Sequence, residues 1–531
     1  MKNTILSFLK NNRTLVLLFS IIIIGSFLRL YHFDDLTRFN TDQVRDAEVA
    51  ENILEGKEFP LLGPKAGGTL FKLGPAFYYF EAFSGFIFGS TPSRMVLFVM
   101  LLAIASIPLL FYFLRYYFSA YTSLFLTLIY SFSFYVIKYS RFGWNPNIIP
   151  FFFILFLLSL LKIIESKNEK FGVWHIWLIV SIGIGVQLHT LLLILMPLLF
   201  LLAYAYIYFE EKKIYWKHLF IIIFASLLIN SPFFIYDFQN NGKNLKNFFA
   251  GTEKKTLKNS SLVENVLKDG QFFIQGNTYA ISSFEPQKNW IKAQKLLDSK
   301  NYGEITAAVC GTLFGLLGLF YLIKNFFTEK NERKKIFLGS VLASTFLSFL
   351  ILFPIANELN VRYFIILIFL PYIFLGFFVN FLLKNFPKKL SLAIIFASFL
   401  LLTGLNLKTY LATYNLENYA TRTSYYGGIS VKESRDISNF MFDLSKMNEL
   451  QGKKFSMSPF KFEPSIRYFN NKNKLKLTDS ATPNLKNSDL IIFSIFDQTD
   501  IEKVSKMKES GYKLIDFMRT GRFTIFAFEK E

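Results

Sequence analysis

Long stretches of apolar residues constrain the fold of this chain more than any other feature. The segments TLVLLFSIIIIGSFLRL (14–30) and IIPFFFILFLLSLLKII (148–164) carry almost no charge over a length that spans a bilayer. The chain is 52% hydrophobic, which lies above the usual range for soluble proteins. No small-residue cleavage site follows the first segment, so we expect it to be retained as a helix. The sequence therefore predicts a polytopic α-helical membrane protein.

The positions of basic residues predict which helix ends share a side of the membrane. We expect about 11–13 transmembrane helices and place eleven of them at residues 14–31, 93–114, 119–137, 148–164, 172–188, 190–208, 218–236, 305–324, 336–354, 362–383 and 390–406. With the N-terminus cytoplasmic, the short inner loops hold about 18 Lys and Arg residues and the short outer loops about 3, as the positive-inside rule requires. The net charge of +20 is then largely a topology signal, and nucleic acid is not an expected partner.

Three large segments are predicted on the outer side. They are the first outer loop 32–92, the second outer loop 237–304 and the C-terminal part 407–531. Within the first loop, residues 75–89 are apolar but short and include Glu81. A crossing there would reverse the charge bias of every later loop. We therefore expect this segment to lie at the outer interface or to re-enter, as a juxtamembrane helix.

The C-terminal part differs in character from the preceding transmembrane domain (1–406). It is polar and contains the runs LIIFSIF (490–496) and FTIFAF (523–528), which are separated by turn-prone residues. Runs of this kind are typical of strands. We predict a small soluble α/β domain on the extracytoplasmic side.

The first outer loop begins with an unusual cluster of charges. Asn40 and Gln43 form the signature of a capping box. Asp42, Arg45 and Asp46 then stand at i, i+3 and i+4 and project from one helix face. One interpretation is a solvated residue at a helix start. The other is that Arg45 and Asp46 hold Asp42 ionised and oriented, so that it serves as a general base toward a hydroxyl group.

Two further cationic positions lie at outer-interface depth. Lys72 precedes the apolar segment 75–89, and Arg362 with Tyr363 enters the tenth predicted span from outside. Each cation either anchors its segment at the interface by snorkelling or supplies a charge for a phosphate carried by a lipid. An arginine on the outer side runs against the positive-inside trend, which favours the second interpretation for Arg362.

Other polar residues at the outer ends of the spans are candidates for substrate binding. Asn145 and Asn147 flank a proline and most simply begin a helix, and His189 most simply marks a tight turn between two spans. The candidates for contacting substrate are Gln43, Tyr78, Asn145, Asn147 and His189. With one cysteine and scattered histidines, the sequence carries no recognisable metal-binding motif.

With these residues in place, the chain resembles the GT-C membrane glycosyltransferases. It is similar in particular to the family 39 protein O-mannosyltransferases and to the aminoarabinose transferases that modify lipid A. The shared elements are DQVRDAEVAENILEG (42–56) after the first span and KLGPAFYY (72–79) about 15 residues later. Weaker similarity follows at NPN, GVQLHT, SPFF and RYFIILIFLP (362–371).

This resemblance implies an activity and roles for several residues. The implied reaction moves a sugar from a polyprenyl-phosphate donor to a hydroxyl group of a protein, lipid or cell-envelope glycan, at the outer face of the cytoplasmic membrane, with inversion at the anomeric carbon. The resemblance assigns the catalytic base to Asp42. It assigns binding of the donor phosphate to Lys72 and to the pair Arg362 and Tyr363.

The chain also departs from the family pattern. The residue after the key aspartate is usually Glu and here is Gln43, and an acidic residue common after the third span is replaced by Asn145 and Asn147. The first change leaves a single carboxylate able to act as base. The second leaves the acceptor and any metal dependence open. We expect no required cofactor, because cationic side chains can cover a phosphate leaving group, and a divalent metal is compatible but not indicated.

Two functions of other classes remain as alternatives. A transporter or flippase of lipid-linked sugars would also have many spans, but it predicts charged or Gly/Pro-broken helices near the middle of the membrane. The predicted span interiors are nearly free of charge. A non-catalytic envelope-assembly protein is also compatible, although it leaves the pattern at Asp42 and Lys72 without a purpose.

Overall fold

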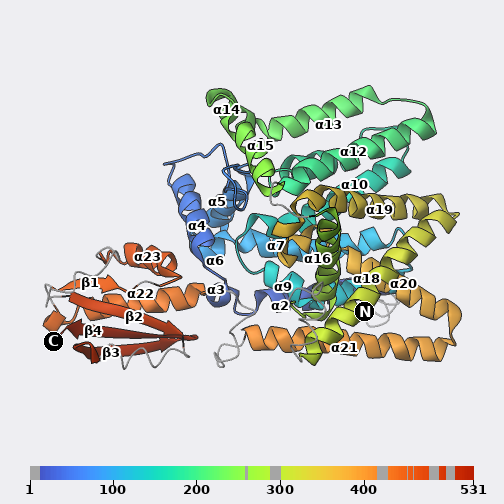
Figure 1. The fold of residues 1–531 in the computed structure, drawn as a ribbon. Coiled ribbons are helices and arrows are strands. Elements are labelled where there is room, and N and C mark those ends of the chain that lie inside the picture. Colours follow the sequence, from blue (N-terminus) through green and yellow to red (C-terminus); the bar gives the residue numbers. More distant parts are fainter. Residues whose placement is uncertain are drawn as a thin grey trace, which may run out of the picture.

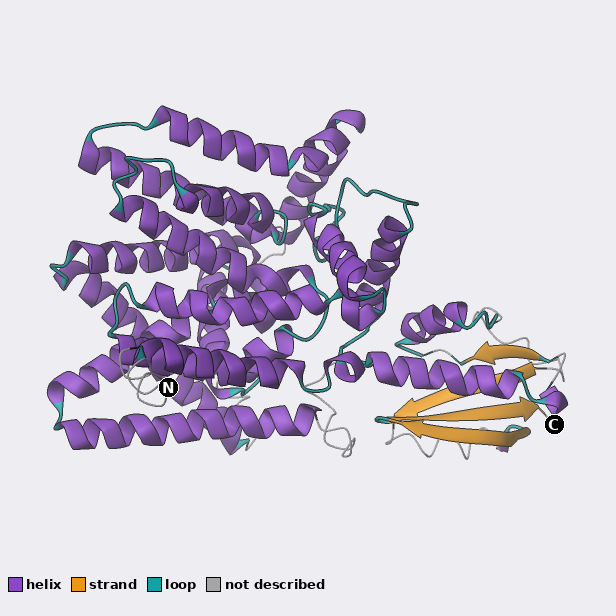
Figure 2. Ribbon diagram, turned by 180° about the vertical axis from the view of Figure 1, so that it is seen from behind, coloured by secondary structure: helices purple, strands orange, loops and turns teal. Residues whose placement is uncertain are grey.

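The computed structural model consists of a large helical bundle and a smaller domain that contains a β-sheet (Figures 1 and 2). It describes residues 12–256, 261–286, 301–414, 428–450, 453–458, 460–477, 490–497 and 509–530. Most bundle helices run side by side, and the sheet domain extends from one end of the bundle (Figure 2). This combination confirms the predicted fold class.

Each of the eleven predicted spans corresponds to a helix. These are α2 (Arg13–Leu30), α7 (Leu97–Leu114), α8 (Ala120–Phe132), α10 (Ile149–Glu165), α11 (Val173–Gly185), α12 (Thr190–Glu211), α13 (Trp216–Ile229), α18 (Tyr302–Thr328), α19 (Glu332–Leu352), α20 (Leu370–Asn385) and α21 (Lys388–Tyr414). Among the described residues, seven helices are long and apolar enough to cross a membrane, or up to nine if each of two bent pairs forms one span. Helices α8 and α11 are apolar but shorter, with 13 residues each.

Three predicted spans are interrupted. The additional elements are α9 (Phe134–Tyr139), α14 (Ser231–Gln239) and η3 (Val361–Leu367). Ser133 separates α8 from α9. The pair α13 and α14 bends by 60° and the pair η3 and α20 by 65°, with Pro232 and Pro371 in the first turns of α14 and α20. Because proline is tolerated in the first turn of a helix but not in its interior, each proline favours a new helix start at the bend.

Two ion pairs group three of the predicted cytoplasmic loops at one end of the bundle. At one end, Lys167 Nζ lies 3.0 Å from Glu211 Oε1, and Arg333 Nε lies 3.2 Å from Glu165 Oε1. These ion pairs join three loops predicted to be cytoplasmic. At the other end lie α4, α5, α6, α14 and α15, and the sheet domain extends from this end (Figure 1). The assignment of the two ends to the two sides of the membrane stays a prediction.

The outer-end elements include several short helices. They are α3 (Phe33–Leu36), α4 (Thr41–Leu54), α5 (Ala76–Phe88), α6 (Pro92–Met95), η1 (Asn145–Ile148), α15 (Lys243–Thr256), α16 (Leu262–Ser282) and η2 (Phe353–Glu358). Helix α5 packs against α4 and exposes Phe83, Phe86, Ile87 and Phe88. An apolar face of this kind fits the predicted interfacial position of the segment.

The C-terminal domain has an α/β architecture. Its elements are α22 (Val431–Ser445), η5 (Asn448–Leu450), β1 (Lys454–Met457), α23 (Glu463–Lys472), β2 (Leu490–Asp497), β3 (Tyr512–Thr520) and β4 (Phe523–Lys530). The strand order is β1-β2-β4-β3, with β1 parallel to β2 and the other pairs antiparallel. The two predicted strands are β2 and β4, which pair directly, for example Phe493 opposite Ala527. A cluster of buried apolar residues joins the sheet to α22 and α23.

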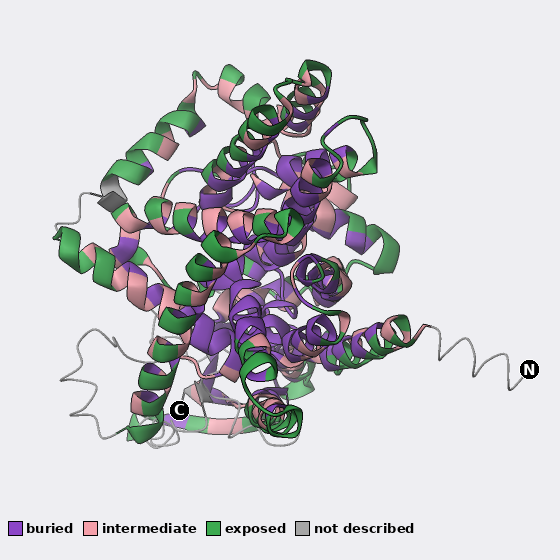
Figure 3. Ribbon diagram, turned by 90° about the vertical axis from the view of Figure 1, so that its right-hand side faces the viewer, coloured by how far each residue is buried: buried purple, intermediate pink, exposed green. Residues whose placement is uncertain are grey.

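Buried residues are concentrated in the middle of the bundle (Figure 3). The apolar stretch that includes η1 and α10 is 83% buried, whereas that of α21 is only 11% buried although its mean hydropathy is 2.1. A helix that is apolar and exposed needs lipid around it. The chain is therefore a multi-pass membrane protein with α10 in its core and α21 at its periphery.

Candidate active site

The predicted capping box forms at the start of α4. The Gln43 side chain accepts a hydrogen bond of 3.1 Å from the backbone N–H of Asn40, and the Asn40 side chain caps the helix in return. The helix therefore begins at Thr41, and Asp42 falls in its first turn, where the helix dipole favours a carboxylate. The Asp42 side chain is 62% exposed, so a substrate hydroxyl has access to it.

Arg45 joins Asp42 to a second carboxylate. Its Nη1 lies 3.1 Å from Asp42 Oδ1, and its Nη2 lies 2.7 Å from Asp46 Oδ1. The Asp46 side chain is only 1% exposed. The structure thus brings together the three charges that the sequence places on one helix face, with Arg45 between an exposed carboxylate and a buried one.

A second buried acid lies beside this cluster. Burial raises the pKa of Asp46 to about 7 even though the Arg45 guanidinium opposes the shift. Burial raises the pKa of Glu81 well above its ordinary range, and the nearby charge of Asp46 adds to the effect. Tyr78 also interacts with Asp46 and Arg45, and burial raises its pKa. Desolvation disfavours charged carboxylates, so burial works against a negative charge on Asp46 and Glu81. Asp42 is the exposed acid of the cluster.

The loop between α9 and α10 contacts both α4 and α5 at Gly143. The Gln43 amide donates a hydrogen bond of 2.7 Å to the Gly143 carbonyl. A Cβ atom at Gly143 would lie 2.7 Å from Glu81 Oε1 and 2.6 Å from a methyl group of Val96. Glycine is therefore required here for close approach rather than for an unusual backbone angle.

Two predicted substrate-binding amides in this loop bind backbone groups. Asn145 Nδ2 donates to the Leu188 carbonyl at 2.5 Å, and Asn147 Nδ2 donates to the Phe142 carbonyl at 2.8 Å. Both asparagines are buried. In this structure their amide donors hold the loop, and contact with a substrate stays a prediction.

Arg362, Tyr363 and His189 lie close to the same loop. Arg362 Nη2 donates to the Tyr363 hydroxyl at 3.2 Å, and the Arg362 guanidinium carbon lies 5.4 Å from the centre of the Trp144 ring. The rings of His189 and Tyr363 are 5.5 Å apart. Arg362 is exposed, so its charge is available on the surface next to Trp144.

Lys72 lies on a hairpin formed by residues 63–73. The Asn244 side chain of α15 accepts from the Lys72 N–H and donates to the Lys72 carbonyl, both at 2.9 Å. The lysine side chain is exposed. At the hairpin tip, a Cβ atom on Gly67 would lie 3.7 Å from the Tyr363 hydroxyl. Contacts therefore run from α4 through Gly143 and Trp144 to Arg362, Tyr363 and the Lys72 hairpin.

The sheet domain packs directly on α4. The Phe39 N–H donates to the Ile429 carbonyl at 2.8 Å, and the rings of Phe39 and Tyr468 are 5.1 Å apart. The Tyr468 hydroxyl donates to Glu51 of α4, and Lys472 Nζ lies 2.6 Å from the same carboxylate. The position of α4 thus depends on both the bundle and the sheet domain.

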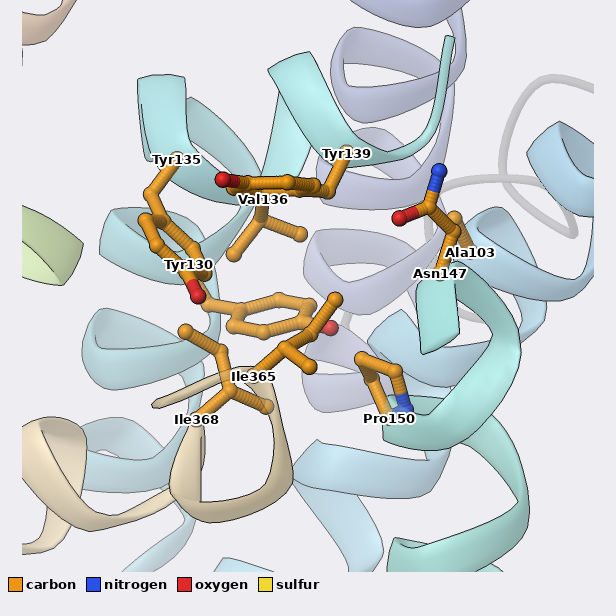
Figure 4. Close-up of a pocket in the computed structure, with 9 residues that line it drawn as sticks. All are labelled: Ala103, Tyr130, Tyr135, Val136, Tyr139, Asn147, Pro150, Ile365 and Ile368. Carbon is orange, nitrogen blue, oxygen red and sulfur yellow. The ribbon is translucent and has the colours of Figure 1, made fainter. Parts of the chain in front are cut away.

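A small internal cavity lies beneath this region. It is lined by Ala103, Tyr130, Tyr135, Val136, Tyr139, Asn147, Pro150, Ile365 and Ile368. Asn147 lies on one side of it and Tyr135 and Tyr139 on another (Figure 4). Its volume is about 10 Å³, room for one water molecule and too little for a sugar. This cavity therefore does not accommodate a sugar substrate.

Comparison with known proteins bears on the fold of the chain. Residues 72–236 match the family described as Dolichyl-phosphate-mannose-protein mannosyltransferase. The ArnT structure from Cupriavidus metallidurans bound to undecaprenyl phosphate superposes with a TM-score of 0.55 at 11% identity and 97% coverage of both chains. The apo form of that protein gives a TM-score of 0.53, with the same identity and coverage. No curated protein matches the chain by sequence.

The chain has the GT-C membrane glycosyltransferase fold. The likeness to ArnT covers 97% of the chain. The family match begins at Lys72, so the segment with Asp42 lies outside it. The fold and the partial family match support a role in glycosyl transfer. The roles of Asp42, Lys72, Arg362 and Tyr363 rest on the motifs and on the geometry above.

The candidate site includes residues that the sequence did not single out. Trp144 connects the Gly143 loop to Arg362, and Lys65 lies opposite Lys72 in the hairpin. The Gly-Gly pair after Lys65 is a turn signal that would have predicted this hairpin. Among the described residues, no group of three or more His, Cys, Asp or Glu side chains is arranged to hold a metal ion.

Proposed function

We propose that this protein is an inverting glycosyltransferase that uses a polyprenyl-phosphate-linked sugar. The observation that carries the proposal is an exposed carboxylate beside exposed cations at the same end of the bundle. Asp42 lies on the helix that contacts the Gly143 loop, and Arg362 lies beside Trp144 of that loop. Lys72 lies on a hairpin whose tip approaches Tyr363. A base for an acceptor hydroxyl and charges for a leaving phosphate are the two requirements of this reaction.

The chemistry follows from these two parts. Asp42 accepts the proton of the acceptor hydroxyl as that oxygen bonds to the anomeric carbon of the sugar. The bond from this carbon to the phosphate oxygen breaks at the same time, and its electron pair stays on the phosphate. Lys72, Arg362 and the Tyr363 hydroxyl stabilise the charge that develops there. Because the acceptor attacks from the face opposite the leaving phosphate, the configuration inverts.

Arg45 is proposed to keep Asp42 ready for this step. Its guanidinium lies 3.1 Å from Asp42 Oδ1 and holds the carboxylate in position by an ion pair. Asp46 holds Arg45 from the buried side, at 2.7 Å. One carboxylate is then enough for catalysis, in keeping with Gln43 at the position next to it.

A lipid-linked donor fits the surroundings of the site. The ArnT structure with the same fold was determined with undecaprenyl phosphate. In the present chain, helix α5 begins four residues after Lys72, and its exposed apolar side chains begin at Phe83. A polyprenyl chain lying along that helix in the membrane would place its phosphate near the hairpin. The acceptor is a hydroxyl group of a protein, a lipid or a cell-envelope glycan, and the reaction takes place at the outer face of the cytoplasmic membrane.

Transfer of labelled sugar tests the proposal directly. Membranes containing the full-length protein receive radiolabelled polyprenyl-phosphate sugars, and label in protein, lipid and glycan fractions is followed. We expect transfer by the wild type and a loss of at least about 100-fold in Asp42→Asn, since general-base catalysis contributes about 10²–10⁴-fold. Asp34→Asn is a matched control, because Asp34 is also an exposed carboxylate of this loop and pairs with Arg94.

The same assay separates the proposal from its alternatives. Donor binding without transfer in the wild type, across a panel of sugars and acceptors, would favour a non-catalytic role. Movement of the intact lipid-linked sugar across the membrane of proteoliposomes would favour a flippase. Full transfer in Asp42→Asn would remove Asp42 as the base. Retained donor binding in that variant would show that the substitution acts on the chemical step.

A further inference from the structure

The hairpin that carries Lys72 has two chemically different faces. Ala66, Phe71 and Leu73 are buried and pack with apolar residues of α12, α14 and α15. Neighbouring residues in a strand point to opposite faces. Lys65 and Lys72 therefore lie on the face opposite this apolar cluster, and both are exposed.

Backbone pairing places these two lysines directly opposite each other. The Ala66 N–H donates to the Phe71 carbonyl at 2.8 Å, and the Leu73 N–H donates to the Pro64 carbonyl at 2.9 Å. This pattern makes Lys65 and Lys72 an antiparallel cross-strand pair without hydrogen bonds between them. Side chains of such a pair are the closer ones in an antiparallel ladder, with Cα atoms about 4.5 Å apart.

The two lysines differ in ion pairing from other lysines at this end of the bundle. Neither lysine forms an ion pair within the described part of the chain, whereas other lysines of the same end have acidic partners, such as Lys57 with Glu55. Two like charges directly opposite each other destabilise a hairpin. The apolar cluster and the Asn244 hydrogen bonds to Lys72 hold the hairpin in spite of this repulsion. A pair of cations maintained at a cost in stability points to an anionic ligand.

We propose that Lys65 is a second lysine of the donor-phosphate site and binds the phosphate together with Lys72. This inference rests on the proposed function and deepens it. The hairpin tip lies against Tyr363, since a Cβ atom on Gly67 would come within 3.7 Å of that hydroxyl. Lys65, Lys72 and Arg362 then surround the phosphate from two separate segments.

The two-lysine arrangement favours the reaction over simple binding of the donor. The donor is a phosphodiester with one negative charge. When the bond to the sugar breaks, the electron pair remains on the phosphate, and the product is a phosphate monoester with close to two charges. An additional cation therefore gains more interaction with the leaving group than with the intact donor. Interactions that grow toward the transition state raise kcat rather than only lowering KM.

Kinetics and product binding together test the role of Lys65. With a polyprenyl-phosphate sugar donor, we expect Lys65→Ala to lower kcat about tenfold and to change the donor KM less. We also expect direct binding of unglycosylated polyprenyl phosphate, measured without turnover in nanodiscs of neutral lipid, to weaken about tenfold. Lys65→Arg should keep most of the wild-type kcat and most of the affinity for polyprenyl phosphate, because it preserves the positive charge. Lys57→Ala removes another exposed lysine of the loop, 67% exposed, and should behave as wild type.

The outcomes separate the inference from the proposed function. If the wild type transfers sugar and Lys65→Ala matches it in kcat and in polyprenyl-phosphate binding, the inference is wrong and the proposed function stands. If the wild type transfers nothing, the proposed function fails, and the binding arm still reports on Lys65. A third outcome is that Lys65→Ala weakens the affinity for polyprenyl phosphate and the affinity for anionic phosphatidylglycerol in nanodiscs by the same factor. That result would identify Lys65 as a general membrane anchor and overturn the inference. Binding of inorganic phosphate equal to that of the lipid would show that the pair recognises the phosphate group alone, and support it.

Discussion

The contact between the sheet domain and α4 offers a quantitative test of how the site is held. Tyr468 of α23 is 4% exposed, packs edge-on against Phe39 at 5.1 Å and donates to Glu51 of α4. Tyr468→Ala removes the ring and the hydrogen bond. Tyr468→Phe removes only the hydrogen bond and leaves Lys472 as a partner of Glu51. If the contact stabilises α4, the two variants should differ in a graded way.

The expected magnitudes follow from the burial of the ring. Truncating a buried aromatic side chain to alanine costs about 3–5 kcal/mol, and losing a hydrogen bond to a charged group costs about 1.5–3 kcal/mol. Helix α4 also packs against α5, which keeps part of its support in both variants. We therefore use the lower end of each energy range. At about 1.4 kcal/mol per tenfold, we expect Tyr468→Ala to open α4 about 100-fold more often and Tyr468→Phe about tenfold more often.

Hydrogen–deuterium exchange measures this opening directly, because amide exchange reports the free energy of local unfolding. The amides of α4 should exchange faster by those factors, and sugar transfer should fall in the same order. The amides of α7 and α10 should be unchanged. Phe517→Ala is the control, because Phe517 is 58% exposed on β3 of the same domain. Exchange of α4 at the wild-type rate in Tyr468→Ala would refute the idea that the domain supports α4. Equal acceleration throughout the bundle would point to global destabilisation.

Two further predictions concern the surroundings of the site. Because the folded pKa of Asp46 is about 7 and its ordinary value is 3.8, the folded protein keeps a proton through this window that the unfolded chain has released. The contribution of Asp46 to stability therefore falls as pH rises toward 7. The melting temperature of Asp46→Asn should rise relative to that of the wild type between about pH 4 and pH 8. A difference in melting temperature that stays constant over this range would contradict the raised pKa. At Gly74, a Cβ atom would lie 2.3 Å from Gln187 Oε1, so Gly74→Ala should displace the start of α5. Overpacking of this kind costs about 1–3 kcal/mol, and we expect the donor KM to rise about tenfold. Gly404→Ala, with nothing within 4 Å of its Cβ, should leave the donor KM unchanged.

Most of the fold could be predicted from the sequence because local patterns specify its helices. Apolar runs of membrane length specify helices without knowledge of their partners, and each predicted span corresponds to a helix. The interruptions at Ser133, Asn230 and Ile368 were not accessible in this way. They fall inside continuous apolar runs, and a proline such as Pro232 or Pro371 is compatible with a kinked helix as well as with a new start. Tertiary packing decides between the two.

The site could be predicted only in part, because some of its contacts are local and others are long-range. The grouping of Asp42, Arg45 and Asp46 depends on helix periodicity, which the sequence carries. The burial of Asp46 depends on α5, and the contact of Trp144 with Arg362 joins residues more than two hundred positions apart. Such long-range contacts leave no periodic signal. The proximity of Lys65 and Lys72 is local, but it required the register of a short hairpin, which one residue of slip would change.

Neutral amides connect the parts of the site, and this choice fits the chemistry proposed for it. Gln43 binds the Gly143 carbonyl, Gln187 accepts from the Ala76 N–H at 3.0 Å, and Asn244 binds both backbone groups of Lys72. Each amide offers a donor and an acceptor in fixed geometry and no net charge. Ion pairs in the same places would put carboxylates beside the cations and weaken their attraction for a phosphate. Linkage through amides and backbone groups leaves the charges of Lys65, Lys72 and Arg362 available for a ligand.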